Sequence, residues 1–107
     1  MIYELRIYKA MPGRMPDLLN RFAKITLSFF EKHGMKVIGF WQPLVGNNNE
    51  LIYLLAFEDI NHFERAWKAM KEDPEWLKAR AETEKNGPLV ENVQNILLTP
   101  TSFSPMK

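Results

Sequence analysis

The seven-residue stretch LIYLLAF, from Leu51 to Phe57, decides the fold, because all of its residues are apolar. It is far too short to span a membrane as a helix, which takes about 20 residues. A strand with one wet face alternates apolar with polar residues, whereas a strand covered on both faces is apolar throughout. We therefore interpret this stretch as a strand that is buried on both sides.

Length and composition favour one domain with its own core. The chain has 107 residues, which is close to the commonest size of a single domain. It contains no cysteine, so disulfides and thiolate metal sites are excluded. The first residues do not form a secretory leader, and together with the lack of cysteine this leads us to expect a cytoplasmic protein.

The charge of the chain argues against two classes of partner. Lys and Arg number 14 against 13 for Asp and Glu, which gives a net charge of +1. The two signs are mixed along the chain, so no basic field is expected that would attract nucleic acid or an anionic membrane. We expect neither partner.

The first half of the chain predicts a strand, a helix and a hairpin. Residues 2–8 alternate in polarity as a strand does, and Pro16 suits the first position of a helix with apolar residues at helical spacing. Gly34 is expected to end that helix in a left-handed conformation. Residues 36–42 are β-branched and aromatic, as in a strand, and residues 46–49 form the tip of the hairpin.

The second half predicts two helices and a last strand. Asn61 begins a capping box and is the expected N-cap of the first of these helices. Asp73 is the expected N-cap of the second, which is shorter, and residues 90–98 form the final strand. We assign one domain to residues 1–98 and a C-terminal tail to residues 99–107.

The order strand, helix, strand, strand, helix, strand predicts an α+β fold of the ferredoxin-like type, βαββαβ, with an extra short helix before the last strand. Right-handed crossovers place both main helices on one side of a four-stranded antiparallel sheet, with the first and third strands in its middle. The other face of the sheet is then left bare.

The bare face predicts a homodimer. Because successive side chains of a strand point to opposite faces, helices on one side cannot cover both faces of apolar strands. An apolar surface of this extent is rarely left in water, so we expect two sheets to pack face to face. The predicted faces are Leu51, Tyr53, Leu55 and Phe57 against Ile52, Leu54 and Ala56 in the third strand, and Val37 and Trp41 against Ile38 and Phe40 in the second.

Three polar residues on the first strand are the candidates for chemistry. Glu4, Arg6 and Tyr8 share one side of a central strand, so part of this set should lie in the covered interior. Buried charges are mostly paired structural groups, and a structural ion pair is the interpretation we favour. In the alternative, Arg6 holds a carboxylate or enolate while Glu4 exchanges a proton.

The histidines and tryptophans carry no strong motif. His33 lies in a last helical turn and His62 in a first one, on separate elements and with no His pair at ligand spacing, so we predict no metal site. Trp41, Trp67 and Trp76 are most simply core or interface aromatics, with a ligand slot as the alternative.

Several short motifs occur together in the chain: Met1 to Tyr8 (MIYELRIY), Pro12-Gly13, Lys32-His33-Gly34, Gly39-Phe40-Trp41 and Asp73-Pro74-Glu75-Trp76. Taken together they resemble the NIPSNAP family, over about residues 1–98. That family belongs to the dimeric α/β-barrel group of ferredoxin-like proteins, so the resemblance implies the same fold and dimer as the patterning. Its animal members are associated with mitochondria and with vesicle or mitophagy signalling, in which they act as binding proteins.

The resemblance leaves two functions open, neither of which implies a cofactor. The first is a homodimeric module that binds a small molecule or a protein. The second is a cofactor-independent enzyme, similar to the monooxygenases or isomerases of the same barrel group, that acts on a small hydrophobic carbonyl or aromatic substrate. In that case Arg6 and Glu4 are its polar groups, and Tyr8 and Trp41 are walls of its pocket. We favour the first, because no acid–base pair of defined geometry is visible in the sequence.

Overall fold

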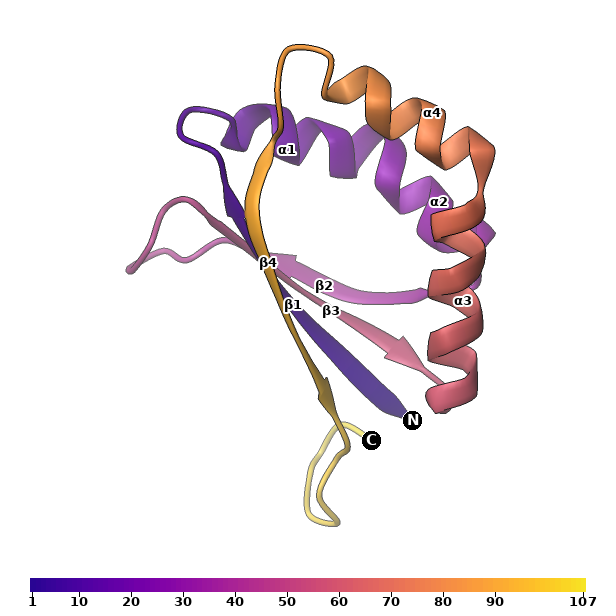
Figure 1. The fold of residues 1–107 in the computed structure, drawn as a ribbon. Coiled ribbons are helices and arrows are strands. Elements are labelled where there is room, and N and C mark those ends of the chain that lie inside the picture. The colour runs from indigo at the N-terminus through magenta and orange to yellow at the C-terminus, as the bar shows by residue number, and fades with distance from the viewer.

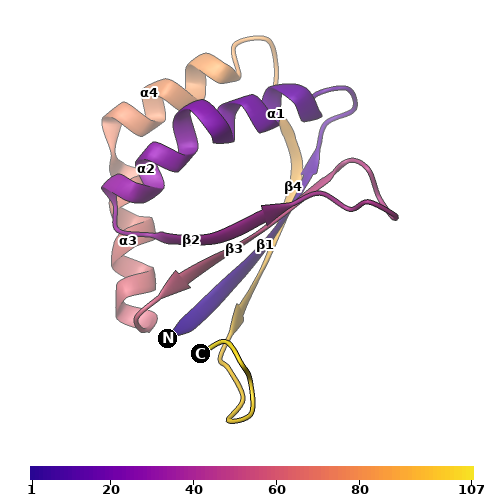
Figure 2. The ribbon, with the colours of Figure 1, turned by 180° about the vertical axis from the view of Figure 1, so that it is seen from behind.

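The computed structural model describes residues 1–107 as a four-stranded sheet with all helices on one side (Figures 1 and 2). The elements are β1 (Ile2–Ala10), α1 (Met15–Arg21), η1 (Phe22–Thr26), α2 (Leu27–Lys32), β2 (Lys36–Trp41), β3 (Glu50–Phe57), α3 (Ile60–Glu72), α4 (Pro74–Thr83) and β4 (Val90–Leu98).

The sheet has the strand order β2-β3-β1-β4, and every neighbouring pair is antiparallel. The first and third strands are therefore central, and the predicted ferredoxin-like α+β fold is confirmed. Seen edge-on, the helices form a second layer that arches over one face of the sheet, while the opposite face has no helix on it (Figure 1). None of the helices combines the length and the apolar character needed to cross a membrane.

The residues of β3 lie on the two predicted faces, and these faces differ in exposure. Tyr53 and its alternate neighbours face the helices and are at most 2% exposed. Ile52 and Leu54 point to the other face and are only partly buried. Neighbouring strands continue this outer face, because residues paired across a sheet point to the same side. Its large exposed side chains include Trp41 at 52%, Ile96 at 50% and Leu98 at 41%.

A register shift in β2 overturns one predicted face. The pairing of β2 with β3 slips by one residue between Val37 and Gly39. Such a bulge inserts an extra residue and reverses the alternation beyond it. Val37 and Phe40 therefore both face the helices, and the prediction that Trp41 shares the face of Val37 is wrong. The Cα pairs are Lys36 with Ala56, Val37 with Leu55, Gly39 with Leu54, Phe40 with Tyr53 and Trp41 with Ile52.

The first helical segment runs without a break through α1, η1 and α2, with a π-helical stretch in its middle. Leu18, Phe22 and Phe30 lie on its buried side at 0–4% exposure. The hydroxyl of Thr26 donates back to the carbonyl oxygen of residue 21 at 3.4 Å. Gly34 follows the helix with a φ of +72°, which confirms its left-handed conformation.

The two later helices begin at aspartates. The side chain of Asp59 accepts from the backbone N–H of His62 at 2.8 Å and is the N-cap of α3. The prediction of Asn61 as the cap is wrong, because the earlier aspartate already starts the helix and Asn61 lies inside its first turn. Asp73 accepts from the backbone N–H of Glu75 at 2.9 Å, so the predicted N-cap of α4 is confirmed.

Candidate functional site

The polar side of β1 faces the helices. Glu4, Arg6 and Tyr8 pair across the sheet with helix-facing residues of β3, and the three side chains therefore point into the space under the helical layer. The structure thus brings together three of the residues singled out in the sequence.

Glu4 is sealed among hydrogen-bond donors. Its carboxylate is completely buried and accepts from the indole of Trp67 at 2.8 Å, the amide of Asn95 at 2.9 Å and the guanidinium of Arg6 at 2.9 Å. Three donors satisfy a buried carboxylate well, and removing any one of them leaves the charge less compensated. Glu4 is therefore built as a structural anchor for Arg6 and Trp67.

Arg6 is held from several sides. Its Nε donates to the Tyr53 hydroxyl at 2.8 Å, Nη1 to Glu4, and Nη2 to the Tyr8 hydroxyl at 3.2 Å. Its guanidinium carbon lies 4.4 Å from the ring centroid of Trp67, within the range of a cation–π contact. These contacts fix the side chain, which remains 15% exposed.

The ionisation of this cluster is set by burial and by its neighbours. Burial raises the pKa of Tyr53 well above its ordinary value, so this phenol is a neutral hydrogen-bonding group. Burial acts to lower the pKa of Arg6, but Tyr8, Tyr53 and Glu4 outweigh it and the pKa is raised overall. The Arg6 guanidinium is therefore a permanent cation beside a neutral phenol.

A cavity of about 470 Å³ lies between this face of the sheet and the helices. That volume is within the range of small-molecule sites, about 300–1,000 Å³. A second hollow of about 460 Å³ adjoins it and shares Arg6, Trp67 and Lys71 with the first. The aromatic rings that line the first cavity are Tyr8, Phe22, Phe30, Trp67 and Trp76.

Trp41 is not part of this site. It pairs with Ile52 on the outer face of the sheet and lines neither hollow. The β2 bulge is the physical reason, since without it Trp41 would share the helix-facing side with Val37. Of the residues considered as pocket walls, Arg6 and Tyr8 reach the cavity and Trp41 does not.

Arg21 is a site residue that sequence reasoning missed. It is the last residue of α1 and lines the cavity, although it is only 5% exposed. Its Nη1 donates to Glu84 at 3.0 Å and to Thr83 at 3.4 Å. Thr83 is the last residue of α4, and Glu84 follows directly after it. The available signal was an arginine adjoining Leu18 and Phe22 on the apolar side of a helix.

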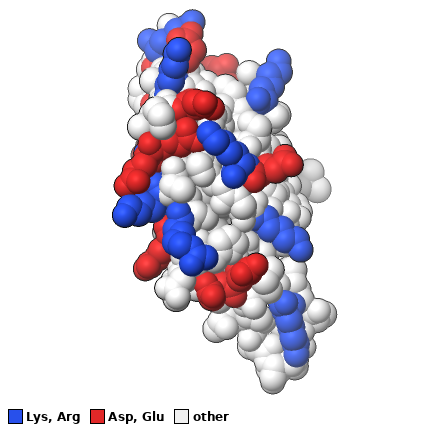
Figure 3. Space-filling model, turned by 90° about the vertical axis from the view of Figure 1, so that its right-hand side faces the viewer, with Lys and Arg blue, Asp and Glu red and all other residues white.

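Charged side chains ring the cavity. Four are basic (Arg6, Arg21, Lys71 and Arg80) and two are acidic (Glu84 and Glu91). On the face shown in Figure 3, by contrast, acidic and basic side chains are interspersed. Basic side chains therefore outnumber acidic ones on the cavity wall.

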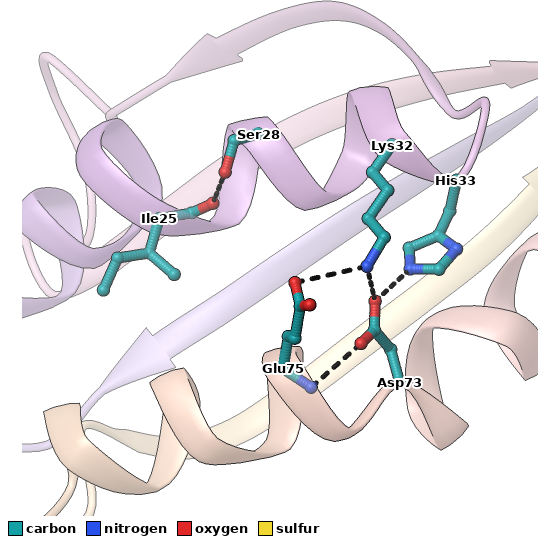
Figure 4. Close-up of polar contacts among 6 residues, drawn as sticks. All are labelled: Ile25, Ser28, Lys32, His33, Asp73 and Glu75. Atoms are coloured by element: carbon teal, nitrogen blue, oxygen red, sulfur yellow. Dashed lines mark hydrogen bonds and ion pairs between the residues drawn. The ribbon is translucent and has the colours of Figure 1, made fainter.

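Two of the family-like motifs meet in a clamp between helices (Figure 4). Asp73 accepts from Lys32 and pairs with the ring of His33, each at 2.8 Å, and so ties the end of α2 to the start of α4. The hydrogen bond from Lys32 holds the pKa of Asp73 well below its ordinary value, with His33 and the Glu75 backbone N–H contributing. The clamp contacts neither hollow and fixes the helical layer.

The other histidine also serves packing. Nδ1 of His62 accepts from the backbone N–H of Glu58 at 2.9 Å, and Nε2 lies 3.0 Å from the carbonyl oxygen of Gly34. These contacts join the start of α3 to the turn before β2. No three His, Asp or Glu side chains lie close enough together to hold a metal ion.

Fold and site together define a ferredoxin-like α+β domain with a ligand-sized cavity between its sheet and its helices. The chain belongs to the NIPSNAP family, which it matches over residues 3–105. It is 26% identical over 106 residues to Protein NipSnap homolog 1 of Danio rerio. The match covers 99% of this chain and 36% of that protein, so the chain spans about a third of its relative's length.

Solved structures show the same fold. A NIPSNAP family protein from Agrobacterium tumefaciens is 23% identical, with a TM-score of 0.88 and coverage of 99% of this chain and 98% of the other. SnoaB, a cofactor-independent oxygenase from Streptomyces nogalater, is 16% identical, with a TM-score of 0.65 and coverage of 97% and 96%. At these identities the likeness concerns the fold.

Proposed function

We propose that the protein is a cytoplasmic homodimer whose cavity binds a small, largely hydrophobic organic molecule. The observation that carries the binding proposal is the cavity itself, a space of about 470 Å³ lined by five aromatic side chains and a fixed Arg6. Apolar walls with a few convergent polar groups are typical of small-molecule sites. The cytoplasmic assignment draws support from the absence of cysteine.

Binding can be tested by following the three tryptophan indoles by NMR during titration with aromatic fragments. Trp67 and Trp76 line the cavity, whereas Trp41 lies on the outer face. A fragment that occupies the cavity should move the indole signals of Trp67 and Trp76 and leave that of Trp41 in place. The proposal fails if no aromatic or apolar fragment moves the first two signals at millimolar concentration.

The homodimer draws support from the outer face of the sheet, where Trp41, Ile96 and Leu98 are 41–52% exposed. Exposed apolar side chains gathered on one face of a small domain mark an interaction surface. Light scattering coupled to size exclusion should give twice the chain mass at micromolar concentration. A mass of one chain would refute the dimer without touching the binding proposal.

The second candidate function is a cofactor-independent enzyme acting on a small hydrophobic carbonyl or aromatic substrate. What favours it is the fold shared with SnoaB, together with Arg6 and Tyr8 on the cavity wall. The sealing of Glu4 by three donors weighs against it, because a proton-transfer residue must reach its substrate. Oxygen uptake with an anthrone, measured without added cofactor, tests the oxygenase version. Uptake abolished by Arg6→Gln would favour the enzyme.

A further inference from the structure

Arg21 has an unused hydrogen-bonding edge beside the cavity. Only Nη1 of its guanidinium bonds to protein, through Glu84 and Thr83. Nε is buried and has no partner, and an unpaired buried donor is unfavourable. Nε and Nη2 lie along one edge of the planar guanidinium, and two adjacent N–H groups of this kind can bind both oxygens of a carboxylate.

Arg6, a partly buried arginine on the same cavity wall, is used differently. Each of its three nitrogens already donates to a protein oxygen, in Tyr53, Glu4 or Tyr8. Its charge is also matched directly by the carboxylate of Glu4 at 2.9 Å. Arg6 is therefore saturated by the protein, whereas Nε and Nη2 of Arg21 form no hydrogen bond within the chain.

The charges around the cavity favour an anion. Glu84 is shared, since it lies 3.0 Å from Arg21 and 3.7 Å from Arg80. Lys71 makes no ion pair within the chain, and Glu91 pairs with Lys9, which is not on the cavity wall, at 3.8 Å. Basic groups in excess in a cleft attract and hold negative ligands.

We propose that the ligand is an aromatic carboxylate, with Arg21 binding its carboxylate through Nε and Nη2 and the ring lying among Phe22, Phe30, Trp67 and Trp76. This inference rests on the small-molecule function proposed above. The π-helical turn η1 begins directly after Arg21, and such turns occur often at functional sites. Arg21 is thus the specificity-determining residue of the cavity.

Calorimetric titration with 2-naphthoate and with the neutral 2-naphthalenemethanol tests the inference. The two probes share their ring system and differ in charge. We expect 2-naphthoate to bind at least about 10-fold more tightly than the alcohol, because only the carboxylate can form a charge-assisted bidentate contact. Arg21→Met should weaken the binding of 2-naphthoate about 10-fold and leave the affinity for the alcohol nearly unchanged.

Two further variants keep the result interpretable. Arg21→Lys keeps the positive charge but lacks the two adjacent N–H groups, so it should bind 2-naphthoate more weakly than the wild type. This variant provides the test if Arg21→Met fails to fold. Arg65→Gln removes an exposed arginine of α3 away from the cavity and should change nothing. Equal affinity of the wild type for both probes overturns the anion preference and leaves the proposed function standing. Failure of both probes to bind overturns the inference and counts against the proposed function as well.

Discussion

The indole N–H of Trp67 donates to Oε1 of Glu4 at 2.8 Å, joining the middle of α3 to a fully buried carboxylate on β1. These residues are 63 positions apart in the chain. The bond links the helical layer to the sheet at the wall of the second hollow, and the Trp67 ring lies against Arg6. Glu4 and Trp67 thereby set the position of one wall of the candidate site.

Trp67→Phe should destabilise the protein by about 1–3 kcal/mol, because it removes a donor from a buried carboxylate. The phenyl ring retains much of the apolar contact, so the loss reports mainly on the hydrogen bond. Urea unfolding followed by circular dichroism measures it. Trp76→Phe is the matched control, since the indole of this half-buried tryptophan makes no hydrogen bond in the structure. An equal effect of both substitutions would show that the Trp67 bond contributes nothing of its own.

The Asp73 clamp predicts a dependence of stability on pH. Its hydrogen bond from Lys32, with help from His33, lowers the pKa of Asp73 below the ordinary 3.8 in the folded state. The resulting stabilisation is complete above the ordinary pKa and is lost as the pH falls below 3.8 through the folded pKa. Asp73→Asn keeps an oxygen for the N-cap but cannot ionise. The urea midpoint of the wild type should therefore exceed that of Asp73→Asn near neutral pH and approach it near pH ~2.

Asp17→Asn provides the comparison for that experiment. Asp17 pairs with Arg14 at 2.9 Å, but its side chain is 61% exposed. Exposed pairs contribute little to stability, so this variant should stay close to the wild type throughout the same pH range. A gap between wild type and Asp73→Asn that stays constant with pH would contradict the role assigned to the clamp.

The start of α3 offers a clean pair of substitutions. Asp59→Ala removes the side chain that accepts from the His62 backbone N–H and should lower the free energy of unfolding by about 1 kcal/mol. Asn61→Ala, within the first turn, should have almost no effect. Thermal or urea unfolding of both variants decides the matter. A larger loss at Asn61 would restore the capping box expected from the sequence.

A charged substitution tests whether the outer face of the sheet joins two protomers. Ile96→Glu places a carboxylate on the surface proposed to join two protomers, and burying an unpaired charge there is unfavourable, so the variant should run as a single chain in light scattering. Leu77→Glu is matched in exposure, 46% against 50%, but lies on α4. It should leave the mass unchanged. A dimer that survives Ile96→Glu would place the interface elsewhere.

Local patterns were enough to predict much of the fold. The apolar run of residues 51–57 indicated the central strand β3, and Gly34 and Asp73 marked a helix end and a helix start because their conformational and capping preferences act within a few residues. Asn61 was mispredicted because Asp59 and Asn61 lie close together and both are favourable N-cap residues, but only one of them can start the helix. The position of Trp41 was mispredicted because a bulge depends on how two strands pair, which neither strand encodes alone.

The sequence by itself determined the order of the elements, the central place of β1 and the shared side of Glu4, Arg6 and Tyr8, because strand alternation is a property of consecutive residues. Only the tertiary structure decided which of them reaches the cavity. Glu4 is sealed by partners from α3 and β4, and Arg21 meets residues 62 and 63 positions away at the end of α4. Such contacts depend on how the helices pack over the sheet. This packing decides which side chains are buried and which of their N–H groups lack a partner.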